Sequence, residues 1–167
     1  MEKMINKMDP GASEGQRLLE EHIERTLYEN NELQKDTMNG MMKCREGRGS
    51  YDDRSLTFVF PVLPWQANRV GNLHGGIICA AFDITIAALA RFFAGENFAP
   101  TVSLDVKYIR PVKVGDDLVV TAKATNAGRR IIQLTAEAVI EETGKLAATA
   151  TSVYLNADTH KERNKEE

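Results

Sequence analysis

Residues 74–90 read HGGIICAAFDITIAALA, and this stretch decides what fold the chain can adopt. It is long enough for a helix of about four turns, and almost all of its side chains are apolar. Asp83 lies in its middle, and burying an ion without a partner costs several kcal/mol. A helix that served only as core would not carry this carboxylate, so Asp83 needs either a partner or a function.

The composition is typical of a soluble globular protein, because 43% of the 167 residues are apolar and 27% are charged. This length leaves room for one domain with a core, plus an appendage. The net charge of −3 gives no electrostatic case for a nucleic-acid partner, which would favour a basic face. Asp83 and Arg91 interrupt the apolar run 77–94, so we expect a buried helix and no membrane span.

The cysteines and the first residues point to a cytoplasmic protein. Cys79 lies in the apolar helix and Cys44 in a polar segment, so a structural disulfide is not expected and a reducing compartment fits. The chain starts with polar and charged residues, without the apolar segment of a secretory signal.

The residue pattern after the long helix predicts antiparallel strands with one buried, apolar face. Thr121 and Lys123, for example, alternate with Val120, Ala122 and other small apolar residues. The predicted elements are an amphipathic helix (14–36), a polar linker (40–54), a strand (55–62), a loop (63–75), the long helix (76–93) and four strands (101–110, 117–126, 131–141 and 146–156).

These elements predict an α+β fold in which an antiparallel sheet covers the long helix. Because this helix is apolar on nearly all sides, a curved sheet or a second subunit is needed to cover it. We expect an N-terminal helical extension and linker (1–50), a main domain (51–157) and a charged C-terminal tail (158–167).

The spacing Asn68-x5-His74-Gly75-Gly76-x6-Asp83 resembles the signature of the hotdog-fold acyl-CoA thioesterases of the phenylacetate-pathway type. The resemblance implies a hotdog fold, with five or six antiparallel strands wrapped around the central helix. It also implies an acyl-CoA substrate and a homodimer whose active sites are shared between subunits, with dimers often paired into tetramers.

The resemblance continues downstream and covers about residues 55–156. The strand 102–111, followed by Gly115-Asp116, is similar to the family's second strand and its exit turn, and 128–130 resembles the turn before its fourth strand. The first 50 or so residues lie outside it.

The resemblance assigns catalytic roles to four residues. The Gly75 N–H, at the helix N-terminus, would polarise the thioester carbonyl. Asp83 of the opposite subunit would act as general base or as nucleophile, and the sequence does not separate these two roles. Asn68 and Ser103 match positions near the attacking water and the thioester. The structural alternatives are a tight loop-to-helix entry for Gly75 and a buried Asp83 that is hydrogen-bonded by Thr85, Ser103 or a backbone amide. For Asn68 and Ser103 the alternative is a loop cap or a strand hydroxyl.

Six further residues are candidates for substrate binding. His74 and Gly76 adjoin the catalytic glycine, and His74 serves better to hold the loop or touch substrate than to transfer protons. Trp65 could line an acyl pocket or fill an interface. Arg110, Arg129 and Arg130 stand at strand turns, where they could bind the phosphates of coenzyme A or simply be solvated. No metal-ligand spacing is present, and no cofactor is implied, because coenzyme A is part of the substrate.

Two other functions stay open at this stage. A hydroxyacyl-thioester dehydratase of the same fold uses a helix carboxylate and a loop histidine, and a non-catalytic acyl-CoA-binding module needs neither. The intact Asp83 and the Asn68 spacing favour hydrolysis of an acyl or aryl thioester.

Overall fold

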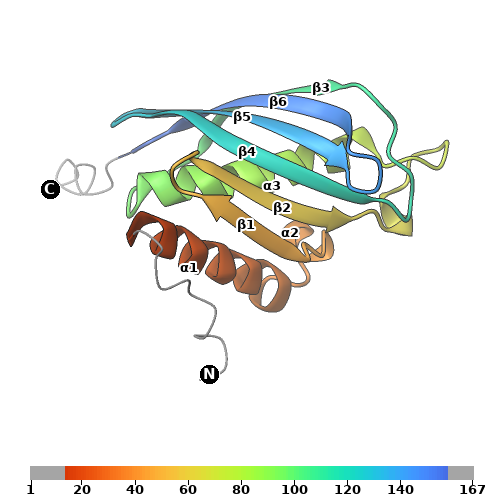
Figure 1. The fold of residues 1–167 in the computed structure, drawn as a ribbon. Helices are drawn as coiled ribbons and strands as arrows, with labels where there is room; N and C mark the ends of the chain where they lie inside the picture. The colour runs from red at the N-terminus through yellow and green to blue at the C-terminus, as the bar shows by residue number, and fades with distance from the viewer. Residues whose placement is uncertain (1–13, 158–167) are drawn as a thin grey trace, which may run out of the picture.

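The computed structural model describes residues 14–157, as six strands and three α-helices with two short helical turns (Figure 1). In chain order the elements are α1 (Glu14–Tyr28), η1 (Glu29–Leu33), α2 (Met38–Met41), β1 (Glu46–Ser50), β2 (Ser55–Pro61), η2 (Pro64–Gln66), α3 (Gly75–Ala94), β3 (Thr101–Tyr108), β4 (Asp117–Ala127), β5 (Ile131–Ile140) and β6 (Lys145–Leu155). The charged tail that we predicted for 158–167 lies outside the described residues.

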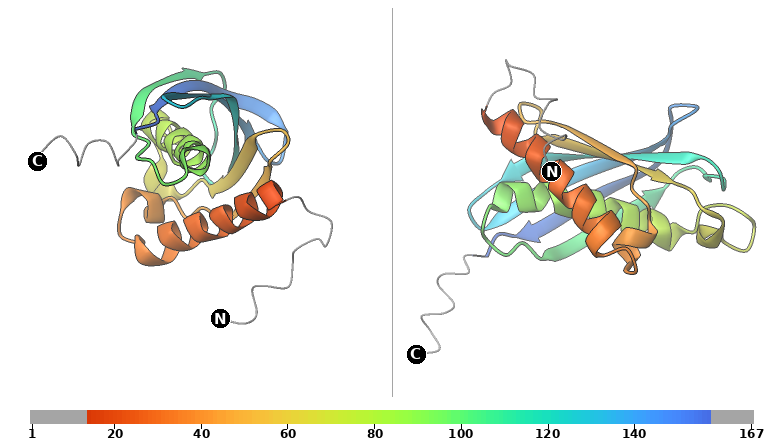
Figure 2. Two further views of the ribbon diagram at one scale, coloured as in Figure 1. Left: turned by 90° about the vertical axis from the view of Figure 1, so that its left-hand side faces the viewer. Right: turned by 90° about the horizontal axis from the view of Figure 1, so that it is seen from below.

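The six strands form one antiparallel sheet in the order β1-β2-β4-β5-β6-β3, so β1 and β3 are its edges. The sheet curls around α3, which lies along its concave face (Figure 2). On β4, Val120 and Ala122 are fully buried against the helix, whereas Thr121 and Lys123 are exposed on the outer face. This arrangement confirms the predicted α+β hotdog architecture and its alternating strands.

Helix α3 spans 20 residues, one more at each end than the sequence predicted. Side chains such as Phe82, Ile86 and Leu89 are fully buried under the sheet. By length and composition the helix could cross a membrane, but here it is the central core helix of the fold. Asp83, Ala87 and Arg91 share one side of α3 that the sheet does not fully cover.

The segment 40–54, predicted to be a linker, instead contains a strand of the sheet. Residues 46–50 form β1, which pairs with β2 from Glu46↔Val59 to Ser50↔Ser55. The apolar alternation that would have revealed this strand is absent, because its inward positions are Gly47 and Gly49.

Helix α1 packs directly on these two glycines. A Cβ atom on Gly47 would lie 2.6 Å from Ile23 Cγ2, and one on Gly49 would lie 2.7 Å from Leu19 Cδ2. Leu19 and Ile23 are buried, so the predicted amphipathic stripe is confirmed. The helix is shorter than predicted, since regular α-helix stops at Tyr28 and η1 follows. Helix α1 therefore lies beside α3 and extends the inner layer to β1 (Figure 2).

Candidate active site

The first turn of α3 presents one backbone N–H without an acceptor. The Gly76 N–H donates to His74 Nδ1 at 2.9 Å, and the N–H groups of Ile77 and Ile78 donate to the His74 carbonyl. Among residues 14–157 the Gly75 N–H has no such partner. An unpaired N–H at a helix N-terminus carries positive partial charge and is suited to an oxyanion.

His74 is the N-cap of α3, because its ring nitrogen Nδ1 accepts the Gly76 hydrogen bond. The neutral ring then carries its proton on Nε2. Of the roles predicted for His74, holding the loop-to-helix entry is the one that this geometry shows.

Tyr108 was not among the predicted site residues, yet it packs on the glycine. Its hydroxyl donates to the Gly75 carbonyl at 3.0 Å, and a Cβ atom on Gly75 would lie 3.3 Å from the tyrosine ring. Glycine therefore allows this close approach. The two residues line a pocket of about 310 Å³ with Asn68, Asn72 and Arg110.

Asn68 holds the loop that leads into this pocket. Its side-chain oxygen accepts hydrogen bonds from the N–H groups of Val70 and Asn72, at 3.0 and 3.1 Å. The structure thus shows the loop-cap alternative for the oxygen. The Nδ2 group has no acceptor within residues 14–157, and Asn68 is among the residues that line the pocket.

Asp83 is half-buried and is held by two hydroxyl groups that the sequence analysis missed. Its Oδ1 atom accepts hydrogen bonds from Tyr154 Oη at 3.0 Å and from Thr101 Oγ1 at 3.2 Å. Tyr154 is 1% exposed, and burial raises the pKa of its phenol, so it stays a neutral donor. The second oxygen, Oδ2, has no partner among the described residues.

Ser103 and Thr85, suggested from the sequence as partners of Asp83, do not contact it. Thr85 Oγ1 donates to the Ala81 carbonyl instead. A β-bulge between Thr101 and Ser103 places Ser103 opposite Val153, while Thr101 stands opposite Tyr154. Strand neighbours alternate between faces, so this one-residue shift gives the contact to Thr101. The residue spacing did not reveal the bulge.

Gly75 and Asp83 do not converge within one chain. They are eight residues apart on α3, which is about 12 Å along the helix axis. The pocket at Gly75 is not lined by Asp83. Cys79 lies between them, and burial together with the Asp83 charge raises the pKa of its thiol, which is unfavourable for a thiolate nucleophile.

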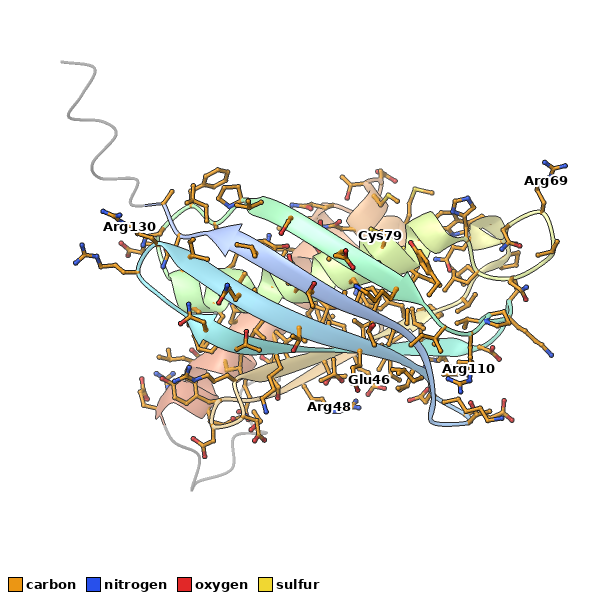
Figure 3. The ribbon with its side chains drawn as sticks, turned by 90° about the horizontal axis from the view of Figure 1, so that it is seen from above. Glu46, Arg48, Arg69, Cys79, Arg110 and Arg130 are labelled. Carbon is orange, nitrogen blue, oxygen red and sulfur yellow. The ribbon has the colours of Figure 1, made fainter. Side chains whose placement is uncertain are left out.

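The three predicted arginines lie at two ends of the molecule. Arg110 lines the Gly75 pocket and donates to the Leu146 carbonyl at 2.6 Å. Arg129 and Arg130 are exposed in the β4–β5 turn, and Arg130 is at the opposite end from Arg110 (Figure 3). Trp65 is exposed in η2 and is not among the pocket-lining residues.

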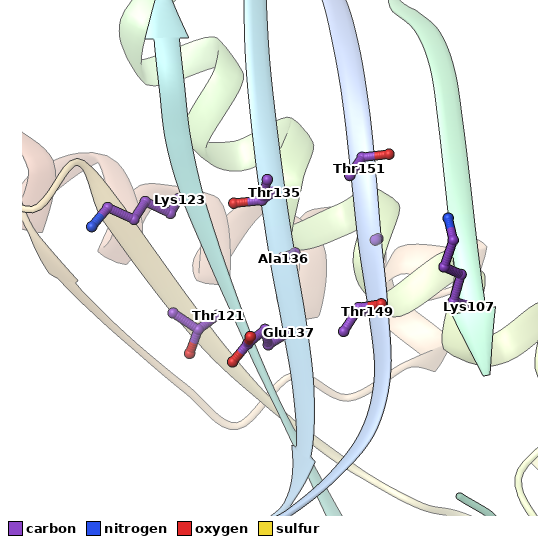
Figure 4. Close-up of a pocket in the computed structure, with 9 residues that line it drawn as sticks. Lys107, Thr121, Lys123, Thr135, Ala136, Glu137, Thr149 and Thr151 are labelled. Carbon is purple, nitrogen blue, oxygen red and sulfur yellow. The ribbon is translucent and has the colours of Figure 1, made fainter. Parts of the chain in front are cut away.

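A larger hollow of about 570 Å³ lies on the outer face of the sheet, away from α3 (Figure 4). Its wall consists mostly of threonine and charged side chains, among them Thr121, Thr135 and Lys107. None of the predicted site residues lines it, so its size alone does not make it the active site.

The sequence of the core segment matches the family model described as the thioesterase superfamily over residues 70–147. Residues 70–147 are therefore similar to this superfamily. The match includes the first turn of α3, Asp83 and strand β3, which supplies both Thr101 and Tyr108.

Individual relatives show the same similarity. Acyl-coenzyme A thioesterase 13 of Homo sapiens is 35% identical over 85 residues, which are 50% of this chain and 59% of that protein. Zebra fish thioesterase superfamily member 2 has the same fold, with a TM-score of 0.70 and 17% identity over 81% of this chain and 98% of that one. A mutant of the phenylacetic acid degradation protein PaaI from Thermus thermophilus gives a TM-score of 0.56 and 25% identity, over 61% of this chain and 84% of that one.

Proposed function

We propose that this protein is an acyl-CoA thioesterase, which hydrolyses an acyl or aryl thioester to a carboxylic acid and coenzyme A. The observation that carries the proposal is the unpaired Gly75 N–H at a pocket, on the same helix as a carboxylate held by two hydroxyls. The superfamily match supports the same reaction class. The human thioesterase is matched over only 59% of its length. Its similarity therefore does not establish the activity or the substrate of this protein, and both are part of the proposal.

In this mechanism the Gly75 N–H donates to the thioester oxygen as negative charge develops on it. One donor of this kind typically contributes about 10²–10³ in rate. Asp83 either removes a proton from the attacking water, whose addition expels the coenzyme A thiolate, or attacks the carbonyl carbon itself. In the second case the thiolate leaves as a mixed anhydride forms, and water then hydrolyses the anhydride to the free acid and restores Asp83. Either role uses the unpaired Oδ2, while Thr101 and Tyr154 hold Oδ1 and fix the orientation of the carboxylate.

A homodimer would bring the two halves of the site together. In one chain Gly75 and Asp83 are separated by about 12 Å along α3, but in a two-fold pair with antiparallel α3 helices Gly75 of one subunit can face Asp83 of the other. Two features support this arrangement: β3 is a sheet edge, and its exposed side chains include Val102 and Tyr108. Pairing of such dimers into tetramers is a further expectation.

Free-thiol release from a panel of short, medium and aryl acyl-CoA thioesters tests the function. We expect release of coenzyme A together with the free acid from at least one class. Loss of water from a hydroxyacyl thioester without acid release would instead indicate a dehydratase. The capping bond of His74 Nδ1 argues against that outcome, because it engages a nitrogen that a base would need. Tight binding without turnover would indicate a binding module.

A further inference from the structure

A third cavity lies beside the two hydroxyl groups that hold Asp83, the carboxylate that the proposed mechanism uses. It has a volume of about 430 Å³ and lies between α1, the C-terminal half of α3 and the start of β3. Its lining includes Thr101 and Tyr154, whose hydroxyls hold Asp83. It also includes two cationic side chains, Arg25 of α1 and Arg91 of α3.

Arg91 is a free cation at the cavity wall. It follows Asp83 by eight residues on the same side of α3, which places the two side chains about 12 Å apart along the helix. Among residues 14–157 its guanidinium makes no hydrogen bond or ion pair. Its charge acts on the pKa of both His22 and Tyr154, so it lies between α1 and β6.

Arg25 is held beside the same cavity by His22. The Nε2 atom of His22 lies 2.8 Å from the Ala88 carbonyl, so it must donate, and Nδ1 is then the acceptor for Arg25 Nη2 at 3.1 Å. Burial lowers the pKa of His22, which favours this neutral ring. His22 therefore positions the arginine and adds no charge of its own at neutral pH.

The acidic side chains near the cavity do not neutralise the two arginines, so the arginines can bind a ligand anion. Glu29 also lines the cavity, but its carboxylate is 3.9 Å from Arg25 Nε and both side chains are largely exposed. Such a pair is weak and can open. Asp83, the other acidic group nearby, does not line the cavity itself but accepts hydrogen bonds from two residues that do, Thr101 and Tyr154.

We propose that Arg25 and Arg91 form an anion subsite that binds a carboxylate or phosphate group of the thioester substrate. This inference rests on the proposed function and names a feature of its substrate. Guanidinium groups bind both anions through paired hydrogen bonds. An extended chain advances about 1.2 Å per bond, so an acyl chain of about ten carbons would carry a terminal carboxylate from Asp83 to Arg91. A phosphate of coenzyme A is the second source of the same chemistry.

Four thioesters separate these two sources: the decanoyl and the mono-decanedioyl thioesters, each on coenzyme A and on N-acetylcysteamine. The variants are Arg91→Gln and Arg25→Gln, with Arg48→Gln on the outer face of β1 as the matched control (Figure 3). We expect Arg91→Gln to raise KM about tenfold for the anion-bearing substrate, with kcat within about twofold. Arg25→Gln should act in the same direction, and Arg91→Lys should recover part of the loss.

The pattern of the effect identifies the anion. An effect confined to both decanedioyl thioesters means that the subsite binds the acyl carboxylate. An effect confined to both coenzyme A thioesters means that it binds phosphate. If Arg91→Gln and Arg25→Gln match Arg48→Gln on all four substrates while the wild type turns them over, the subsite is refuted and the thioesterase proposal stands.

If the wild type hydrolyses none of these compounds, the subsite is tested by direct binding. Calorimetric titration with coenzyme A and with decanedioate then measures whether the subsite binds either anion. Binding of either probe that weakens about tenfold in Arg91→Gln supports the subsite, and equal binding by both proteins overturns it. An unchanged melting temperature for Arg91→Gln confirms that the variant is folded.

Discussion

The two edges of the sheet, β1 and β3, differ in whether a helix covers the inner face beside them. At the β1 end, α1 packs on Gly47 and Gly49 and covers the inner face. At the β3 end the inner layer stops at α3, and β3 carries exposed side chains such as Val102, which is 62% exposed. Asp83 lies at this second end, against Thr101 of β3. The chain thus completes one end of its sheet itself and leaves open the end that holds the carboxylate.

The open end is most sharply tested by Asp83→Asn. We expect kcat to fall about 10²–10⁴-fold, because general-base catalysis contributes an effect of this size. Steady-state kinetics measures the loss, and the circular dichroism spectrum and molecular mass should match the wild type. Turnover at the wild-type level would remove Asp83 from the mechanism.

Complementation between two inactive variants tests whether a second subunit completes the active site at the β3 edge. Gly75→Val keeps the backbone N–H, but its side-chain atoms would crowd the Tyr108 ring, 3.3 Å from the Cβ position, and block the approach of the thioester oxygen. Loss of that hydrogen bond should cost about 10²–10³ in rate. When this variant is unfolded and refolded together with Asp83→Asn, half of the dimers are mixed and half of their sites are intact. About a quarter of the wild-type activity should return, whereas a site within one chain would recover nothing.

Gly47→Ala tests how tightly α1 packs on the β1 edge. The new methyl group would lie 2.6 Å from Ile23 Cγ2 and from Phe58, so α1 or the strand must shift. Overpacking of this kind destabilises by about 1–3 kcal/mol. Urea unfolding measures the change in unfolding free energy, with Arg48→Ala as the control on the opposite face of β1. Equal stability of the two variants would show that α1 is not tightly packed on the strand.

A smaller, pH-dependent effect is expected from His22, which joins α1 to α3. Burial lowers its pKa below the ordinary 6.5. The unfolded chain therefore binds this proton first as the pH falls, so the contribution of His22 to stability is present above pH 6.5 and is lost below it. His22→Gln should flatten that part of the curve of unfolding free energy against pH. An unchanged slope between pH 7 and 5 would contradict the assigned tautomer and its buried environment.

Local patterns were sufficient for the main elements but not for the contacts between them. The apolar helix, its glycine entry and the alternating strands were predicted because each is encoded within a few residues. Strand β1 escaped prediction because its inward residues are glycines that α1 covers. Tyr108 gave no local signal of its contact with Gly75, since 33 residues separate the pair.

By itself, the sequence determined that an apolar helix carries one carboxylate two turns after a glycine pair, because helical spacing follows directly from residue order. Tertiary structure alone decided which groups hold that carboxylate. The bulge in β3 sets the register against β6, and a one-residue shift exchanges the faces of a strand, so Thr101 and Tyr154 meet Asp83 while Ser103 does not. Tertiary structure also brought Arg25 of α1 and Arg91 of α3 to the wall of one cavity, a placement of distant segments that no local pattern encodes.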